Sequence, residues 1–200
     1  MTPLSDNTKQ FRLRMSRHER RHPWLSLLLD CYAIIDYSVD KSISQSEKKI
    51  VCHNGCSFCC YQTIPLSTIE SAGIKFYVQT ILNDGLRSLI IKQFNECVKI
   101  CIFNSHGSCL VYPLRPIACR RYIITSECCT LNEDPTESRP NDILEPSREY
   151  LYRAVEMTLP FYESQNIHLL ANEHIFDFYK KQNVRLSSAY GHILNSTKKY

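Results

Sequence analysis

Four cysteines stand within nine residues of this chain, in the order Cys52, Cys56, Cys59 and Cys60. A loop with this spacing, Cys-x3-Cys-x2-Cys-Cys, can turn three sulfurs toward one metal centre. Because neighbouring side chains point in different directions, Cys59 and Cys60 either serve two centres, or one of them is a ligand while the other packs. The spacing therefore predicts a metal-binding loop.

The chain contains eleven cysteines among its 200 residues. Disulfides are the alternative use of so many cysteines, and they form in oxidising compartments. The first apolar run, Leu25 to Leu29, is too short for a secretory signal, and Asp30 follows it. An odd number of cysteines would also leave one unpaired after complete oxidation. We therefore expect a cytoplasmic chain whose thiols are reduced and available to bind metal.

A second group of cysteines, Cys101, Cys109 and Cys119, has wider spacing. Gly107 permits a turn just before Cys109. Two prolines stiffen the segment that leads to Cys119. A rigid loop suits metal ligands, so we expect this group to complete the site begun by the first group.

Three arginines accompany the last cysteine of the second group: Arg115, Arg120 and Arg121. A guanidinium group can offset the negative charge of a thiolate cluster, or bind a carboxylate or phosphate of a small ligand. Arg115 and Arg120 are the candidate cofactor-binding residues. The alternative is a solvated basic surface.

These motifs resemble those of the YkgJ-type cysteine-cluster proteins, a family described as carrying a zinc- or iron-chelating domain. The family pairs a C-x3-C-x2-CC cluster with a later segment close to G-x-C-x-x-Y-x-x-R-P-x-x-C-R. The matching residues here are Cys52, Cys56, Cys59, Cys60, Cys101, Gly107, Cys109, Tyr112, Arg115, Pro116, Cys119 and Arg120. The resemblance covers residues 50 to 130, and the departure from it is Ile102, where the family usually has proline.

The resemblance implies a metal site with eight cysteine ligands, the eighth being Cys128 or Cys129. Some relatives form part of a flagellin lysine N-methylase. The resemblance implies that such an enzyme depends on an iron–sulfur cluster and S-adenosylmethionine. Those chains are longer, so methyl transfer is not carried over to this chain.

Iron–sulfur clusters accept irregular cysteine spacings, and three close cysteines with a distant fourth are a common way to hold a [4Fe–4S] cluster. Zinc ribbons usually show two CxxC knuckles, and this chain has one, Cys56 to Cys59. We therefore expect an iron–sulfur cluster, with Zn²⁺ as the alternative. We interpret His53 and His106 as ordinary loop histidines, although either could replace a cysteine at zinc.

Two further motifs occur in unsuitable contexts. The segment Cys52-x3-Cys56-x-Phe58-Cys59 also resembles the radical S-adenosylmethionine motif. That resemblance implies a strand–helix barrel, and the sequence shows few strand patterns. His18 to His22 spells HExxH, the zinc-protease motif. Pro23 follows at once and disfavours helix at His22, so we interpret this match as a coincidence.

Hydrophobic periodicity predicts a mainly α protein, a small helical domain with irregular cysteine-rich loops. We expect a basic, flexible arm over residues 1–22 and a single metal-binding domain over 23–200. Cys31 falls on a buried helical stripe and is interpreted as a core thiol, while Cys97 is either core or an auxiliary ligand. The expected helices cover residues 24–40, 67–82, 86–101, 146–162 and 167–181, and a proline-rich loop covers 104–147.

Three functions fit these features: a metal-binding protein for redox or metal handling, a cluster-dependent S-adenosylmethionine-using enzyme such as a lysine methylase, and a zinc-stabilised interaction module. The first is our main expectation. No segment is long and apolar enough to span a membrane. The basic residues near the N-terminus are a weak nucleic-acid signal, and the sequence does not identify a protein or small-molecule partner.

Overall fold

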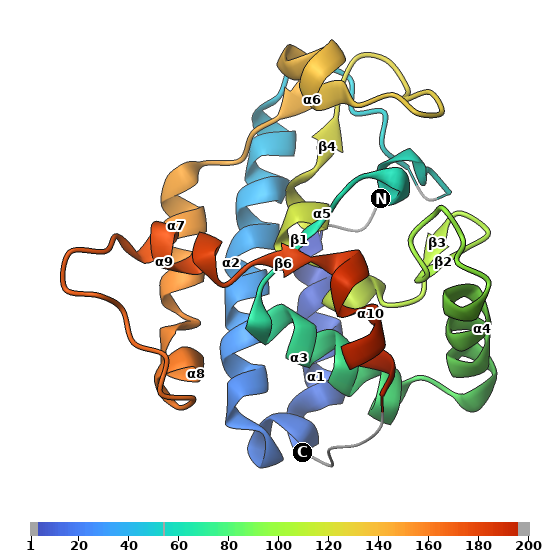
Figure 1. Ribbon diagram of the computed structural model, residues 1–200. Helices are drawn as coiled ribbons and strands as arrows, with labels where there is room; N and C mark the ends of the chain where they lie inside the picture. Colours follow the sequence, from blue (N-terminus) through green and yellow to red (C-terminus); the bar gives the residue numbers. More distant parts are fainter. Residues whose placement is uncertain (1–3, 54, 196–200) are drawn as a thin grey trace.

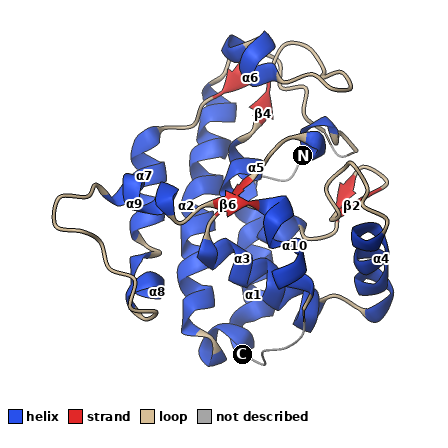
Figure 2. Cartoon of the chain, in the orientation of Figure 1, coloured by secondary structure: helices blue, strands red, loops and turns tan. Residues whose placement is uncertain are grey.

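The computed structural model describes residues 4–53 and 55–195, and it is mainly helical, as predicted (Figures 1 and 2). The helices are α1 (Leu4–Arg21), α2 (Pro23–Gln45), α3 (Thr68–Phe76), α4 (Asp84–Asn95), α5 (Ile117–Arg121), α6 (Pro135–Ser138), α7 (Arg148–Glu156), α8 (Leu159–Glu163), α9 (Ile175–Lys181) and α10 (Leu186–Leu194). Shorter helical turns cover Phe58–Tyr61, Tyr77–Ile81, Tyr112–Leu114 and Pro140–Asp142. None of the described helices is long and apolar enough to cross a membrane.

Strands of two residues pair antiparallel at three places in the described chain. The pairs are β1 (Pro65–Leu66) with β6 (Val184–Arg185), β2 (Asn104–Ser105) with β3 (Ser108–Cys109), and β4 (Ile123–Ile124) with β5 (Ile143–Leu144). These pairs join loops between helices. The described residues therefore do not form the strand–helix barrel that the resemblance to radical S-adenosylmethionine enzymes implies.

Helix α2 is the centre of the main hydrophobic core. Pro23 occupies its first turn, where the missing N–H costs nothing, and a stripe that includes Leu28, Tyr32 and Ile35 is buried. Helices α1, α3, α5, α7 and α8 pack around it, and Figure 1 shows α2 running through the middle of the molecule. Cys31 on this helix is completely buried in the core, which confirms the prediction made for it.

Residues 4–21 form helix α1, so the prediction of a flexible arm there is wrong. Polar contacts hold this helix against α2, and hydrophobic periodicity does not detect them. Arg12 pairs with Asp30 and the Thr8 hydroxyl donates to Asp36, while the Ser5 hydroxyl donates to Asp40 at 2.8 Å. The HExxH segment runs past the end of α1, because the helix ends at Arg21 and His22 caps α2.

Helix α3 begins with a capping box formed by Ser67 and Glu70. The backbone N–H of Ser67 donates to the Glu70 carboxylate at 2.9 Å, and its hydroxyl donates at 2.6 Å. One face of α3 contributes to the main core. A second core lies on its other side, where Ile74 and Val78 meet Leu186 and Ile193.

Helix α4 ends at Asn95, six residues before the predicted end at Cys101. The N–H of Cys97 donates to the carbonyl of Phe94 and that of Val98 to the carbonyl of Gln93, which is the Schellman pattern of helix termination. Cys97 occupies the left-handed position, φ 48°, that usually holds glycine. It is exposed, so the core interpretation is wrong, and it does not share a helical face with Cys101.

The predicted helix 146–162 is two helices, α7 and α8. Pro160 has no N–H to donate to the preceding turn, which prevents one continuous helix. The predicted helix 167–181 begins only at Ile175, where the His174 ring accepts a hydrogen bond from the N–H of Phe176 at 3.2 Å. Residues 104–147, predicted as loop, are ordered by short elements.

Candidate metal centre

The first cysteine loop is attached to the end of the second cysteine segment through Cys52. The N–H of Val51 donates to the carbonyl of Ile124 at 3.1 Å, and the N–H of Ile124 donates to the Cys52 sulfur at 3.2 Å. Ile124 belongs to β4, which directly follows the short helix α5. Cys52 therefore lies beside the chain that leaves the helix carrying Cys119.

A second attachment joins the helical turn Phe58–Tyr61 to the chain around Cys101. The N–H of Cys101 donates to the carbonyl of Cys60 at 2.9 Å. The Asn104 amide donates to the Cys60 sulfur at 3.6 Å, a normal length for sulfur. Cysteines 41 positions apart in the sequence are thus neighbours.

The hairpin of β2 and β3 holds Cys109 beside the first cysteine loop. It pairs Cys109 with Asn104, and its turn contains Gly107 at φ +80°. A Cβ at Gly107 would lie 2.7 Å from the carbonyl oxygen of Gly55, so glycine is required there by conformation and by space. The two cysteine segments pack directly against each other at this point.

The buried carboxylate of Glu70 fixes helix α5, which carries Cys119. One Glu70 oxygen accepts the N–H of Ile117 at 2.6 Å, and the other accepts the Tyr179 hydroxyl at 2.9 Å. Glu70 is 1% exposed, so it joins the starts of α3 and α5 to α9 inside the protein. Cys119 is thereby held by a network that joins α3, α5 and α9.

Arg120 has a structural partner, Asp36. Its Nη1 donates to the Asp36 carboxylate at 2.6 Å, its Nε donates to the carbonyl of Arg115 at 3.0 Å, and its Nη2 donates to the carbonyl of Pro113. The guanidinium also lies 3.9 Å from the ring centre of Tyr32. Each nitrogen of Arg120 already donates within the protein, which fits a structural role better than the predicted cofactor contact.

Arg115 is the cation whose charge acts on cysteines of both segments. Burial raises the pKa of Cys52, Cys109 and Cys119, the pKa of Cys109 reaching about 12, and the positive charge of Arg115 lowers the pKa of all three. The Arg115 Nε is buried and has no hydrogen-bond partner among the described residues. One guanidinium therefore faces thiols from both cysteine segments.

The thiols also affect one another. After burial, the charge of Cys109 is the next cause that raises the pKa of Cys119, and Cys101 and Cys60 act in the same direction. Cys56 belongs to the same group of interacting thiols, because its charge raises the pKa of Cys59. These mutual effects indicate that cysteines from several chain segments converge.

Cys59 and Cys60 do not point apart as the sequence suggests. A hydrogen bond between their side chains raises the pKa of Cys59, together with burial, and lowers the pKa of Cys60. The hydrogen bond from Asn104 also lowers the pKa of Cys60. Of the two, Cys60 is the thiol that ionises more easily.

The eighth ligand suggested by the resemblance is Cys128 or Cys129. Cys128 is exposed, and Cys129 is buried. The charge of Cys128 raises the pKa of Cys52, and burial followed by the charges of Cys56 and Cys52 raises the pKa of Cys129. Both therefore lie near the first cysteine loop.

The loop histidines are not grouped with these thiols in the described structure. His53 and His106 are exposed, and a ring nitrogen of His53 lies 2.9 Å from the carbonyl oxygen of Val51. As the side chains stand, no three histidine, cysteine, aspartate or glutamate residues of the described chain form a group that could hold a metal ion. The cysteines converge without forming a preassembled site.

Two residues at this site were not singled out by the sequence analysis, Asn104 and Tyr190. Tyr190, on α10, hydrogen-bonds to Cys101 and lowers the pKa of that thiol against the larger effect of burial. Asn104 stands between Cys101 and Gly107 and could have been examined with them. Tyr190 is remote in the sequence and carries no local signal.

Comparison with known proteins gives no relative: no family model matches the chain, and no curated protein and no solved structure matches it. The functional argument therefore depends on the residues of this chain.

Proposed function

We propose that this chain is a cysteine-cluster metalloprotein that binds an iron–sulfur cluster, with Zn²⁺ as the alternative occupant, for redox chemistry or metal handling. The observation that carries the proposal is the position of Arg115, whose charge acts on Cys52 from one segment and on Cys109 and Cys119 from the other. A half-buried cation among thiols would stabilise the thiolate form that binds metal.

The chemistry of the donors fits a thiophilic centre. Cys52, Cys56, Cys59, Cys60, Cys101, Cys109 and Cys119 are all partly accessible, and each is a soft sulfur donor. Burial keeps most of these groups as neutral thiols, so binding a metal would release protons. Because no group of three potential ligands is preassembled among the described residues, binding would also require side-chain rotation within the two attached loops.

The roles of the chain's own residues follow from the contacts. The cysteines would hold the metal, Arg115 would offset the negative charge of the thiolates, and Asn104 and Tyr190 would orient Cys60 and Cys101. A bound iron–sulfur cluster would supply one-electron transfer. Arg120 would act by fixing α5 through Asp36.

The visible absorption of protein purified under nitrogen tests the identity of the occupant. A brown protein with broad visible absorption that bleaches on reduction supports the cluster. A colourless protein that contains zinc would show that Zn²⁺, and not the cluster, is the occupant. Saturable binding of S-adenosylmethionine by the brown protein would instead favour a modifying enzyme.

A further inference from the structure

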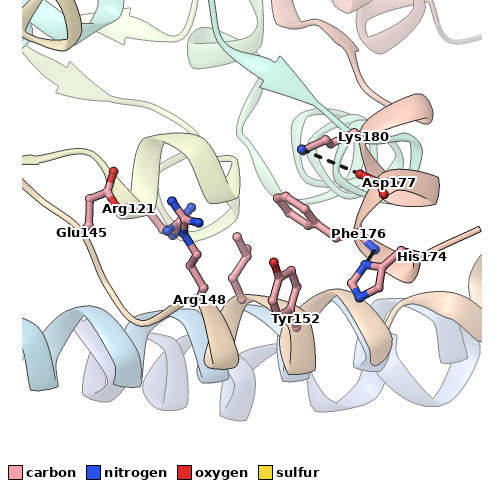
Figure 3. Close-up of a pocket in the computed structure, with 9 residues that line it drawn as sticks. Arg121, Glu145, Arg148, Tyr152, His174, Phe176, Asp177 and Lys180 are labelled. Carbon is pink, nitrogen blue, oxygen red and sulfur yellow. Dashed lines mark hydrogen bonds and ion pairs between the residues drawn. The ribbon is translucent and has the colours of Figure 1, made fainter. Parts of the chain in front are cut away.

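A pocket of about 560 Å³, lined by no cysteine, lies between the end of α5 and helices α7 and α9 (Figure 3). Its size is within the range of small-molecule sites. Arg121, Glu145 and Arg148 line one end, and Tyr152 and Phe176 line the other. The pocket thus combines a charged end with an aromatic end.

The charged end has two guanidinium groups and one nearby carboxylate. Arg121, Glu145 and Arg148 come together from the end of α5 and the start of α7 to line this end of the pocket. The Arg121 Nε is buried without a hydrogen-bond partner among the described residues, and its Nη2 has only a 3.5 Å contact with the carbonyl of Pro146. Within the described chain Arg148 forms no ion pair.

The other charges that line the pocket offset each other. Lys180 lies 3.9 Å from Asp177, and its ammonium group is 4.5 Å from the ring centre of Phe176. Glu145 is then the one carboxylate that faces two guanidinium groups. This end of the pocket retains positive charge and suits a doubly charged anion such as a phosphate monoester.

The aromatic end exposes part of the Tyr152 ring. Tyr152 is 40% exposed, and its ring contacts Phe176 and His174 edge to face, with the centres 5.3 and 5.4 Å apart. The exposed part of Tyr152 lines the pocket, where a flat ligand can pack against it. Stacking of a nucleobase on such a side chain is typically worth about 1–3 kcal/mol.

From this arrangement we propose that the pocket binds a nucleoside monophosphate, with the phosphate on Arg121 and Arg148 and the base against Tyr152. The two guanidinium groups favour a phosphate dianion over a single carboxylate. None of the residues that line the pocket is a candidate metal ligand.

Titration calorimetry on the full chain as purified tests this proposal with AMP, GMP, CMP and UMP, and with inorganic phosphate as a separate titrant. We expect saturable binding of at least one nucleotide, weakened about tenfold or more by Arg148→Gln. Tyr152→Leu should weaken nucleotide binding and leave phosphate binding unchanged. Both side chains are exposed, so neither variant should unfold the protein.

Arg153→Gln is the matched control, since Arg153 is exposed on the same helix and does not line the pocket. Its binding should equal that of the unmodified chain. The proposal is overturned if no nucleotide binds saturably, or if Arg148→Gln and Arg153→Gln behave alike. Inorganic phosphate binding as tightly as every nucleotide would also overturn it, because the aromatic end would then contribute nothing.

Discussion

The backbone N–H of Cys101 donates a 2.9 Å hydrogen bond to the carbonyl oxygen of Cys60. This bond holds the second cysteine segment against the first without using either thiol. The backbone therefore keeps the two cysteines together whatever partners their sulfurs take. The site is therefore best described as two cysteine loops joined at their backbones.

Cys119→Ser should remove bound metal, because Cys119 interacts with thiols of both segments. Metal content after purification under nitrogen is the measurement, and a loss of half or more is expected. Cys97→Ser is the matched control, since Cys97 is exposed and outside the cluster. Equal metal content in the two variants would contradict the ligand assignment.

Cys31→Ser should retain the metal but lose stability. The new hydroxyl would lie in the hydrophobic core beside α2, at a cost of about 1–3 kcal/mol in the free energy of unfolding. Urea unfolding followed by circular dichroism measures this cost. Loss of metal from the folded variant would show that Cys31 is a ligand and that its assignment to the core is incomplete.

Cys60 should be alkylated at lower pH than an ordinary thiol, whose pKa is about 8.5. The hydrogen bonds from Cys59 and Asn104 stabilise its thiolate and lower its pKa. In metal-free protein, the rate of iodoacetamide labelling at Cys60, read by mass spectrometry, should rise through a midpoint below that value. Asn104→Ala should move the midpoint upward, and a midpoint unchanged by this substitution would remove Asn104 from the site.

Arg120→Gln should destabilise the fold by about 3–5 kcal/mol, because it leaves the Asp36 carboxylate buried without its cation. Chemical unfolding with urea measures the change. Arg153→Gln, at an exposed position, should change the free energy by less than about 0.5 kcal/mol. An equally small effect at Arg120 would show that its ion pair with Asp36 does not stabilise the fold.

Glu70→Ala should cost at least about 3 kcal/mol, since it leaves the N–H groups of Ser67 and Ile117 and the Tyr179 hydroxyl without their acceptor. The matched control is Glu156→Ala, an exposed acid on α7. Thermal and urea unfolding of both variants test the difference. Similar stabilities would show that water replaces the carboxylate.

The helices with strong apolar periodicity could be predicted from the sequence, and α2 and the capping box of α3 illustrate this. Helix α1 could not, because Arg12 and Thr8 hold it through partners on α2 that become neighbours only after folding. The end of α4 was missed because Cys97 takes the left-handed position where a glycine would have marked the end.

The candidate site shows the same division. The cysteine spacing indicated which thiols to consider, and Arg115 was already among the candidate residues. The structural role of Arg120 depends on Asp36, and the contact of Tyr190 with Cys101 depends on α10. Neither partner is close in sequence, so no local pattern predicts these contacts.

Elemental analysis of the freshly purified chain, kept under nitrogen, tests the central claim most directly. The account predicts stoichiometric iron with acid-labile sulfide, or stoichiometric zinc if the alternative occupant is the correct one, and loss of either in Cys119→Ser. A folded protein that contains neither metal, and that takes up neither when supplied with iron and sulfide or with zinc, would contradict the account.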